Sequence, residues 1–237
     1  GKAWYLLGER CSVWFSDKVV ADAKVIYDYY KKTYNIDPVV IPYGAYAKEG
    51  KSDILTEFSL QPKKYLLYVS RLEPENNALG VIEAYKKSKA QMPLVIVGDA
   101  PYAKEYKKKL NQAAKGQNVI FTGFQFKDPY WVLQANCYLY IQATEVGGTH
   151  PALVEAMAYG NCIIANGTPE NKEVLGDAGL FYEKNNFIQL ADLINQCIAD
   201  PDSVQKFGKL AKERADKFYN WDKVKEDYLK LFYSLVN

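Results

Sequence analysis

The feature that most constrains the fold of this chain is a regular alternation of short apolar runs with amphipathic helical segments. Each run spans three to five residues and is rich in Val, Ile, Leu and Tyr, a composition typical of strands buried on both faces of a parallel sheet. Between the runs, apolar residues recur with helical spacing, as at Leu79, Ile82 and Tyr85. This alternation predicts an α/β fold, a Rossmann-like parallel sheet with helices on both faces. The predicted strands are Lys18–Ala21, Val39–Ile41, Tyr65–Val69, Leu94–Val97, Val119–Thr122, Tyr138–Ile141, Cys162–Ala165 and Leu180–Tyr182.

The alternation is interrupted once, near the amino terminus. Residues 1–42 predict helix, strand, helix and strand, whereas residues 43–63 are polar and rich in turn formers. So small a unit cannot bury both of its faces alone, so we expect residues 1–42 to be the tail of a neighbouring domain and residues 43–63 to be an interdomain linker. Residues 64–220 then form the main domain, and the amphipathic segment 221–237 is expected to pack back on the tail as a helix.

Composition excludes several classes of function. The 30 Lys and Arg residues nearly balance the 28 Asp and Glu residues, so no nucleic-acid partner is expected. One histidine and four scattered cysteines argue against a metal site. Cys137 and Cys162 fall inside predicted strands, as buried thiols of a reducing compartment would. With no apolar run long enough to span a bilayer, the chain is expected to be cytoplasmic, and a peripheral association with the inner face of the plasma membrane stays open.

A first group of candidate binding residues follows the predicted strand at 65–69. Ligands of open α/β sheets bind outside the carboxyl ends of the strands, where Ser70 and Arg71 stand in this sequence. Asn76 or Asn77 would cap the helix that follows, so its amides and the planar guanidinium together suit a phosphate. The alternative is a structural ion pair between Arg71 and one of the two glutamates that follow it.

A second group is stronger, because two adjacent glycines, Gly147 and Gly148, precede a predicted helix at 152–159. Glycines let the backbone approach a ligand closely, and Thr149 or His150 can cap the helix. A helix that begins in this way presents oriented amides to an anion.

Other candidate residues carry a weaker signal. Glu155 lies just over one turn into that helix, where its carboxylate could accept hydrogen bonds from ribose hydroxyls; the alternative is an exposed helical glutamate. His150 is either a ligand contact or a capping or core histidine. Gly98, Gly123 and Phe124 also follow strand ends, and the loop at Phe124 could seat a nucleobase.

Taken in order, these segments resemble the donor-binding domain of retaining glycosyltransferases of family four, the group-one pattern of the GT-B fold. The resemblance runs from about Lys64 to Tyr219 and is weaker from Ser16 to Gly44. It implies that the chain is a GT-B carboxyl-terminal domain with a remnant of the amino-terminal acceptor domain, and that most of the acceptor half lies outside this sequence.

The resemblance also implies roles for residues around the diphosphate. In the family, the arginine of an RLxxEK segment binds the donor diphosphate, and it matches Arg71 here. Asn76 stands where the family usually has the lysine of that segment. Further diphosphate contacts are implied for the amides of Gly148–His150.

The family carries two glutamates separated by seven residues, and only the second of them has a match in this sequence. The second, which holds the ribose, matches Glu155, so Arg71 and Glu155 are the implied catalytic residues. Gly147 occupies the place of the first, which contacts the sugar, and Glu145 lies two residues out of register. The group that recognises the sugar hydroxyls is therefore not identified.

The stretches Pro74–Asn77 and Val146–Pro151 look like a bacterial subgroup of rhamnosyltransferases of cell-surface polysaccharide synthesis. The implied donor is dTDP-rhamnose, with UDP- and GDP-sugars as alternatives, and the implied acceptor is a saccharide or lipid-linked saccharide bound by the absent half. The resemblance implies transfer with retention of anomeric configuration. The absence of an acidic pair at the strand ends predicts a site without metal or other cofactor. This chain alone is expected to bind donor and to show little or no transfer.

Functions of other classes remain as alternatives. A dinucleotide-dependent oxidoreductase would need GxGxxG after its first strand, but Ser70–Asn77 contains no glycine. A nucleotide-sugar epimerase or a phosphorylase of the same architecture normally carries additional acid–base groups or a cofactor lysine. A non-catalytic module that binds a sugar nucleotide would use the same residues as the donor domain.

Overall fold

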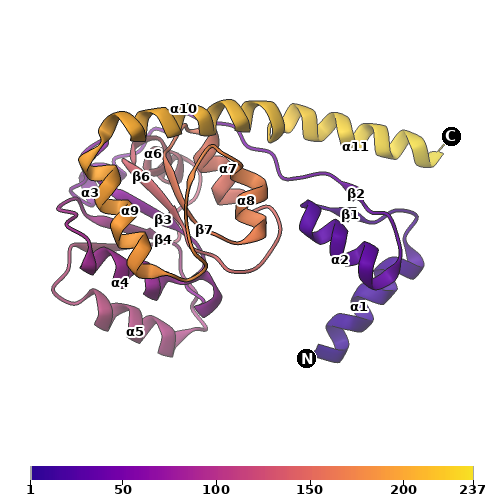
Figure 1. The fold of residues 1–237 in the computed structure, drawn as a ribbon, viewed down its shortest axis with the longest axis horizontal. Helices are drawn as coiled ribbons and strands as arrows, with labels where there is room; N and C mark the ends of the chain where they lie inside the picture. Colours follow the sequence, from indigo (N-terminus) through magenta and orange to yellow (C-terminus); the bar gives the residue numbers. More distant parts are fainter. Residues whose placement is uncertain (1, 237) are drawn as a thin grey trace.

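The computed structural model describes residues 2–236, and a parallel six-stranded sheet forms its centre (Figure 1). The strand order is β5-β4-β3-β6-β7-β8, so successive strands are added on one side of β3 and then on the other. This change of side creates a topological switch point at the carboxyl ends of β3 and β6. All eight predicted strands are present, with ends shifted by at most two residues, and the predicted fold class is confirmed. The six strands are β3 (Leu66–Val69), β4 (Leu94–Val97), β5 (Val119–Gly123), β6 (Leu139–Gln142), β7 (Ile163–Asn166) and β8 (Leu180–Tyr182).

Helices cover both faces of this sheet because side chains alternate along each strand. In β3, Leu67 packs into one core, whereas Leu66 and Tyr68 pack into the other. The first core is closed by α3 (Ile54–Glu57), α6 (Asp128–Asn136), α7 (Pro151–Ala158), α8 (Pro169–Leu175) and α10 (Pro201–Phe218). The second is closed by α4 (Ala78–Lys87), α5 (Lys104–Ala114) and α9 (Phe187–Ala199).

A second, separate unit comprises the amino-terminal elements and the last helix. The elements are α1 (Lys2–Phe15), β1 (Val20–Ala21), α2 (Lys24–Tyr34), β2 (Val39–Val40) and α11 (Trp221–Val236), and β1 and β2 form their own parallel pair. Ile41, Val224 and Leu231 make a small core there. Helix α11 therefore packs on the amino-terminal segment, and Figure 1 shows it extending from α10 across to β1 and β2.

The segment predicted as a linker contributes to the main core. Ile54 and Leu60 are 2% and 7% exposed and belong to the cluster beneath the first face of the sheet. Ile54 begins the one-turn helix α3, which was hidden in the sequence by the surrounding polar and turn-forming residues. Residues 43–63 therefore cover the sheet rather than only connecting two units.

Helix α1 exposes large apolar side chains to solvent. Trp4, Trp14 and Phe15 are 76%, 64% and 84% exposed. Within residues 2–236, no helix combines the length and the apolar character that a membrane span requires.

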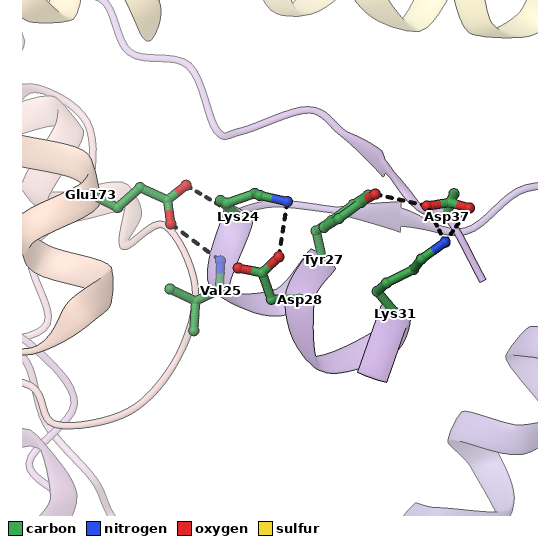
Figure 2. A network of polar contacts seen from close by, with 7 residues as sticks. All are labelled: Lys24, Val25, Tyr27, Asp28, Lys31, Asp37 and Glu173. Atoms are coloured by element: carbon green, nitrogen blue, oxygen red, sulfur yellow. Dashed lines mark hydrogen bonds and ion pairs between the residues drawn. The ribbon is translucent and has the colours of Figure 1, made fainter. Parts of the chain in front are cut away.

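The contact between α2 and α8 joins the two units, and Figure 2 shows it. Ala23, at the start of α2, has no side-chain acceptor for the first amides of that helix. The Glu173 carboxylate of α8 accepts them instead, from the backbone nitrogens of Lys24 at 2.6 Å and Val25 at 3.2 Å. A distant carboxylate thus satisfies amides that every helix leaves unpaired at its start. The neighbouring pair of Lys31 and Asp37 is solvent-exposed and adds little to stability.

Close packing of α10 on the end of α7 gives a test of the fold. A methyl group added to Gly208 would overlap with the carbonyl oxygen of Gly160, so we expect Gly208→Ala to lower the free energy of unfolding by about 1–3 kcal/mol. Gly8→Ala in α1 is the matched control, because its added methyl group meets no atom within 4 Å. The measurement is chemical denaturation of both variants. Equal midpoints for Gly208→Ala and the wild type would contradict this packing.

Candidate functional site

A cavity of about 480 Å³ opens at the carboxyl ends of β3, β4, β5 and β6. The four strand ends singled out in the sequence therefore converge on one space, at the topological switch point where open α/β sheets bind ligands. Of the predicted binding residues, seven line it: Ser70, Arg71, Asn76, Gly98, Phe124, Gly147 and His150.

The backbone of Ser70 and Arg71 is fixed by its neighbours. Gly98 has a φ of 124° and lies so close to the Ser70 carbonyl oxygen that a Cβ atom there would collide with it. Only glycine combines that dihedral angle with that approach. The Asn76 side-chain amide donates to the Arg71 carbonyl at 2.9 Å. The arginine is therefore presented to the cavity by a rigid main chain.

The Arg71 side chain is mostly free of the protein. The side chain is 68% exposed, and its guanidinium lies 3.3 Å from the Glu73 carboxylate, the structural ion pair that the sequence left open as an alternative. The other Glu73 oxygen accepts a hydrogen bond from Tyr102. The Glu73 side chain is only 15% exposed, so an anionic ligand would have to compete with this carboxylate for the guanidinium.

The glycine-rich turn presents one side to the cavity and the other to the amino-terminal unit. Gly147, His150 and the first residues of α7 line the cavity. Thr149 is buried, and its hydroxyl donates to the Asp22 carbonyl at 2.5 Å. Gly148 lies directly against the Asp22 carboxylate. Asp22 thus covers the outer side of the turn, while the helix start remains open toward the cavity.

The predicted side-chain caps are wrong. Neither Thr149 nor His150 caps α7 through its side chain, because the Thr149 hydroxyl is engaged by Asp22. Asn77 precedes α4 but does not cap it through its side chain either. Its amide donates instead to the Ala143 carbonyl at 3.0 Å and to the Glu145 carboxylate at 2.9 Å. Asn77 therefore ties the start of α4 to the segment that follows β6, and Glu145 is occupied as its acceptor.

Glu155 and Gly123 do not line this cavity. Within α7, the Glu155 carboxylate accepts a hydrogen bond from the Tyr130 hydroxyl, and burial raises its pKa. The Gly123 carbonyl accepts a hydrogen bond from the backbone N–H of Gly98 at 2.8 Å. Gly123 therefore helps to hold Gly98 close to the Ser70 carbonyl.

An aromatic pair forms the cavity wall after β5. The rings of Phe124 and Phe126 stack with centroids 5.9 Å apart and planes 22° apart, and Phe124 is 49% exposed. Phe126 and the intervening Gln125 also line the cavity but were not predicted. Two phenylalanines spaced two residues apart directly after a strand end were the sequence signal that could have identified this wall.

The electrostatics of the site favour a neutral histidine. Burial lowers the pKa of His150, and the nearby carboxylates of Glu170 and Asp22 offset part of this shift. Among residues 2–236, no group of three histidine, cysteine or acidic side chains is placed to hold a metal ion. The positive charge at the cavity comes from Arg71, reinforced by the amides at the start of α7. The site is thus suited to a ligand with an anionic centre and a flat aromatic end.

Comparison with protein families identifies the fold and its relatives. Residues 54–214 match the family described as Glycosyl transferases group 1. The alpha-monoglucosyldiacylglycerol synthase of Streptococcus pneumoniae is 25% identical over 194 residues, which are 73% of this chain and 42% of that protein. The lipopolysaccharide 1,2-N-acetylglucosaminetransferase of Salmonella typhimurium is 25% identical over 232 residues, 89% of this chain and 60% of that protein. This chain spans about half the length of the curated relatives it matches.

A solved structure shares the whole arrangement. Anabaena HepE in complex with UDP and glucose superimposes with a TM-score of 0.89 at 20% identity, over 99% of this chain and 68% of that one. At this level of identity the likeness concerns the fold, which includes both the six-stranded sheet and the amino-terminal unit.

His150 is the single histidine of the chain, so its titration can be followed without assignment. We expect its pKa, measured by NMR, to lie below the ordinary 6.5 because burial disfavours the imidazolium. Unfolding restores the ordinary value, so the unfolded chain binds more protons, and the stability contributed by His150 is lost as pH falls below 6.5.

The carboxylates around His150 set the size of this shift. Glu170→Gln should lower the pKa further, whereas Glu213→Gln on the exposed side of α10 should leave it unchanged. A pKa at or above 6.5 in the wild type would contradict the burial of this ring.

Proposed function

We propose that this chain, which belongs to the glycosyl transferases group 1 family, is the donor-binding part of a glycosyltransferase and holds a nucleotide-activated sugar in the cavity above β3 to β6. One observation carries the proposal: Arg71 and the start of α7 border the same cavity. A guanidinium offers a planar set of donors, and a helix start offers oriented amides. Together they suit the diphosphate of such a donor.

The two ends of the cavity fit the two ends of a nucleotide. We assign the nucleobase to the side of Phe124, whose exposed ring face supports stacking. We propose ribose recognition by Glu155 on the family resemblance, since Glu155 lies within α7 outside the cavity lining and one of its carboxylate oxygens already accepts a hydrogen bond from Tyr130. Ser70 and Asn76 also border the diphosphate region.

Catalysis would follow from the stabilisation of the leaving group. Cleavage of the anomeric bond leaves negative charge on the nucleoside diphosphate, and the loss of one fixed donor aimed at such charge costs about 3 kcal/mol. Arg71 and the amides at Gly147–His150 would supply this stabilisation without a metal ion. We propose retention of anomeric configuration, with the acceptor bound by sequence beyond this chain.

The identity of the donor is proposed at two levels. A nucleoside diphosphate sugar is supported by the cavity itself. The finer proposal is dTDP-rhamnose, which the subgroup resemblance of Pro74–Asn77 and Val146–Pro151 suggests. A UDP-hexose is the alternative, because HepE, which shares the fold, binds UDP and glucose.

Calorimetric titration of the chain with dTDP, UDP, GDP and ADP in EDTA tests the proposed site. We expect one of them to bind, and Arg71→Ala to weaken that nucleotide at least about tenfold, because it removes a charged hydrogen-bond donor. Arg71→Lys should recover only part of this loss, since lysine lacks the planar fork.

Arg10→Ala is the matched control, because Arg10 lies exposed on α1 and away from the cavity lining. Unchanged affinity in Arg71→Ala, or equal losses in both variants, would argue against a diphosphate site at Arg71.

The nucleobase position has its own test. We expect Phe124→Ala to weaken the preferred nucleoside diphosphate by roughly tenfold, because base stacking on an aromatic ring contributes about 1–3 kcal/mol. Inorganic pyrophosphate lacks a base, so its affinity should stay the same in this variant. Equal weakening of both ligands would place the base elsewhere.

Transfer itself requires the intact protein. We expect the complete polypeptide to transfer sugar from a nucleotide donor, and Arg71→Ala to remove most of that activity. Donor binding without transfer by the complete protein would favour a non-catalytic sugar-nucleotide-binding module. Release of an altered sugar without any acceptor would favour an epimerase.

A further inference from the structure

Asp22 belongs to the amino-terminal unit, but its carboxylate lies at the glycine-rich turn of the cavity. It follows β1 directly and packs against Gly148, so closely that a methyl group on that glycine would overlap with it. Gly148 follows Gly147, which lines the cavity. Asp22 is partly exposed and lies next to the cavity lining rather than within it.

The backbone around Asp22 is held on both sides. The Thr149 hydroxyl donates to its carbonyl at 2.5 Å, and Glu173 binds the first amides of α2 two residues further on. These contacts fix the backbone at Asp22, and the carboxylate itself accepts hydrogen bonds from its own backbone and from that of Thr149. A side chain fixed in this way is organised in advance to accept a hydrogen bond.

The sugar of the proposed donor must lie near this turn. If Arg71 and the start of α7 hold the diphosphate, the sugar is attached at its distal phosphate and extends away from the nucleobase side at Phe124. Sugar hydroxyls donate to carboxylates, and such charge-assisted hydrogen bonds are stronger than neutral ones. A carboxylate at Gly148 is placed to receive them.

Three other carboxylates lie near the cavity, and each has a feature that argues against this role. Glu145 already accepts a hydrogen bond from Asn77. Glu75 lines the cavity in the short segment that follows Arg71, on the diphosphate side. Glu170 acts on His150 but belongs to α8, without a contact to the glycine pair comparable to that of Asp22.

We infer that Asp22 is a specificity-determining residue of the donor site, supplied across the boundary between the two units, and that its carboxylate binds a hydroxyl of the donor sugar. This inference rests on the proposed function of the cavity. The sequence left the sugar-recognising group unidentified, because Gly147 has no side chain to offer; the packing against Gly148 brings a carboxylate to the same turn.

The Asp22 carboxylate already accepts hydrogen bonds from backbone amides. Burial raises the pKa of Asp22, and hydrogen bonds from its own backbone and from the Thr149 backbone offset part of this rise. An amide side chain at position 22 would keep the shape of the aspartate and lose its charge.

Titration of matched ligand pairs tests the inference: UDP against UDP-glucose, and dTDP against dTDP-rhamnose. The chain is used in full, as wild type and as Asp22→Asn and Asp22→Ala. We expect both variants to bind the nucleoside diphosphate within about twofold of the wild type and to bind its sugar conjugate at least about tenfold more weakly. Thermal unfolding of each variant confirms that it is folded.

Three controls separate this role from others. Glu173→Gln loosens the same boundary, so an equal selective loss in that variant would mean that docking of the two units, not hydroxyl binding, is responsible. A selective loss in Glu75→Gln or Glu170→Gln, with Asp22→Asn unaffected, would assign the sugar to that glutamate and overturn the inference. Equal weakening of nucleotide and conjugate in Asp22→Asn would also overturn it. Failure of the wild type to bind any nucleotide would instead remove the proposed function, and the inference with it.

Discussion

The site depends on a reciprocal exchange of polar contacts across the boundary between the two units. Asp22 packs its carboxylate on the turn before α7 and receives the Thr149 hydroxyl at its carbonyl. In return, Glu173 of α8 accepts the first amides of α2. Neither helix caps itself, since Ala23 has no acceptor and His150 makes no cap bond. Because unpaired helix amides are costly when removed from water, Glu173 completes the start of α2 across the boundary, whereas the start of α7 stays open toward the cavity.

The same logic explains why so few side chains build the cavity. Parallel strands bring their carboxyl ends to one edge, so main-chain geometry does most of the positioning. The close approach of Gly98 to the Ser70 carbonyl and the bond from Asn76 to the Arg71 carbonyl fix the loop after β3. Asn77 ties that loop to the end of β6. The polar side chains Asn76 and Asn77 thus hold the backbone of the loops in place, and these loops position Arg71 and the α7 amides at the cavity.

The sequence predicted those parts of the structure that local pattern determines. Apolar runs located every strand, since burial on both faces requires a continuous run. The strand ends led to Arg71 and to the turn at Gly147, both of which border the cavity. The caps were wrong because the partners of Thr149 and Asn77 lie far away in sequence. Asp22 went unnoticed for the same reason: a carboxylate after a two-residue strand carries no local sign that it meets a turn more than a hundred residues later.

If the cavity holds the proposed donor, these contacts would link its recognition to docking of the amino-terminal unit. The Arg71 side chain is exposed although its partner Glu73 is largely buried, so a diphosphate would compete with Glu73 for the guanidinium. The turn before α7 differs, because Asp22 of the amino-terminal unit packs against Gly148 while Gly147 and His150 line the cavity. A ligand that contacts both the turn and Asp22 would bind more tightly when the two units are docked than when they are apart. By linkage, it would then also stabilise the docked arrangement.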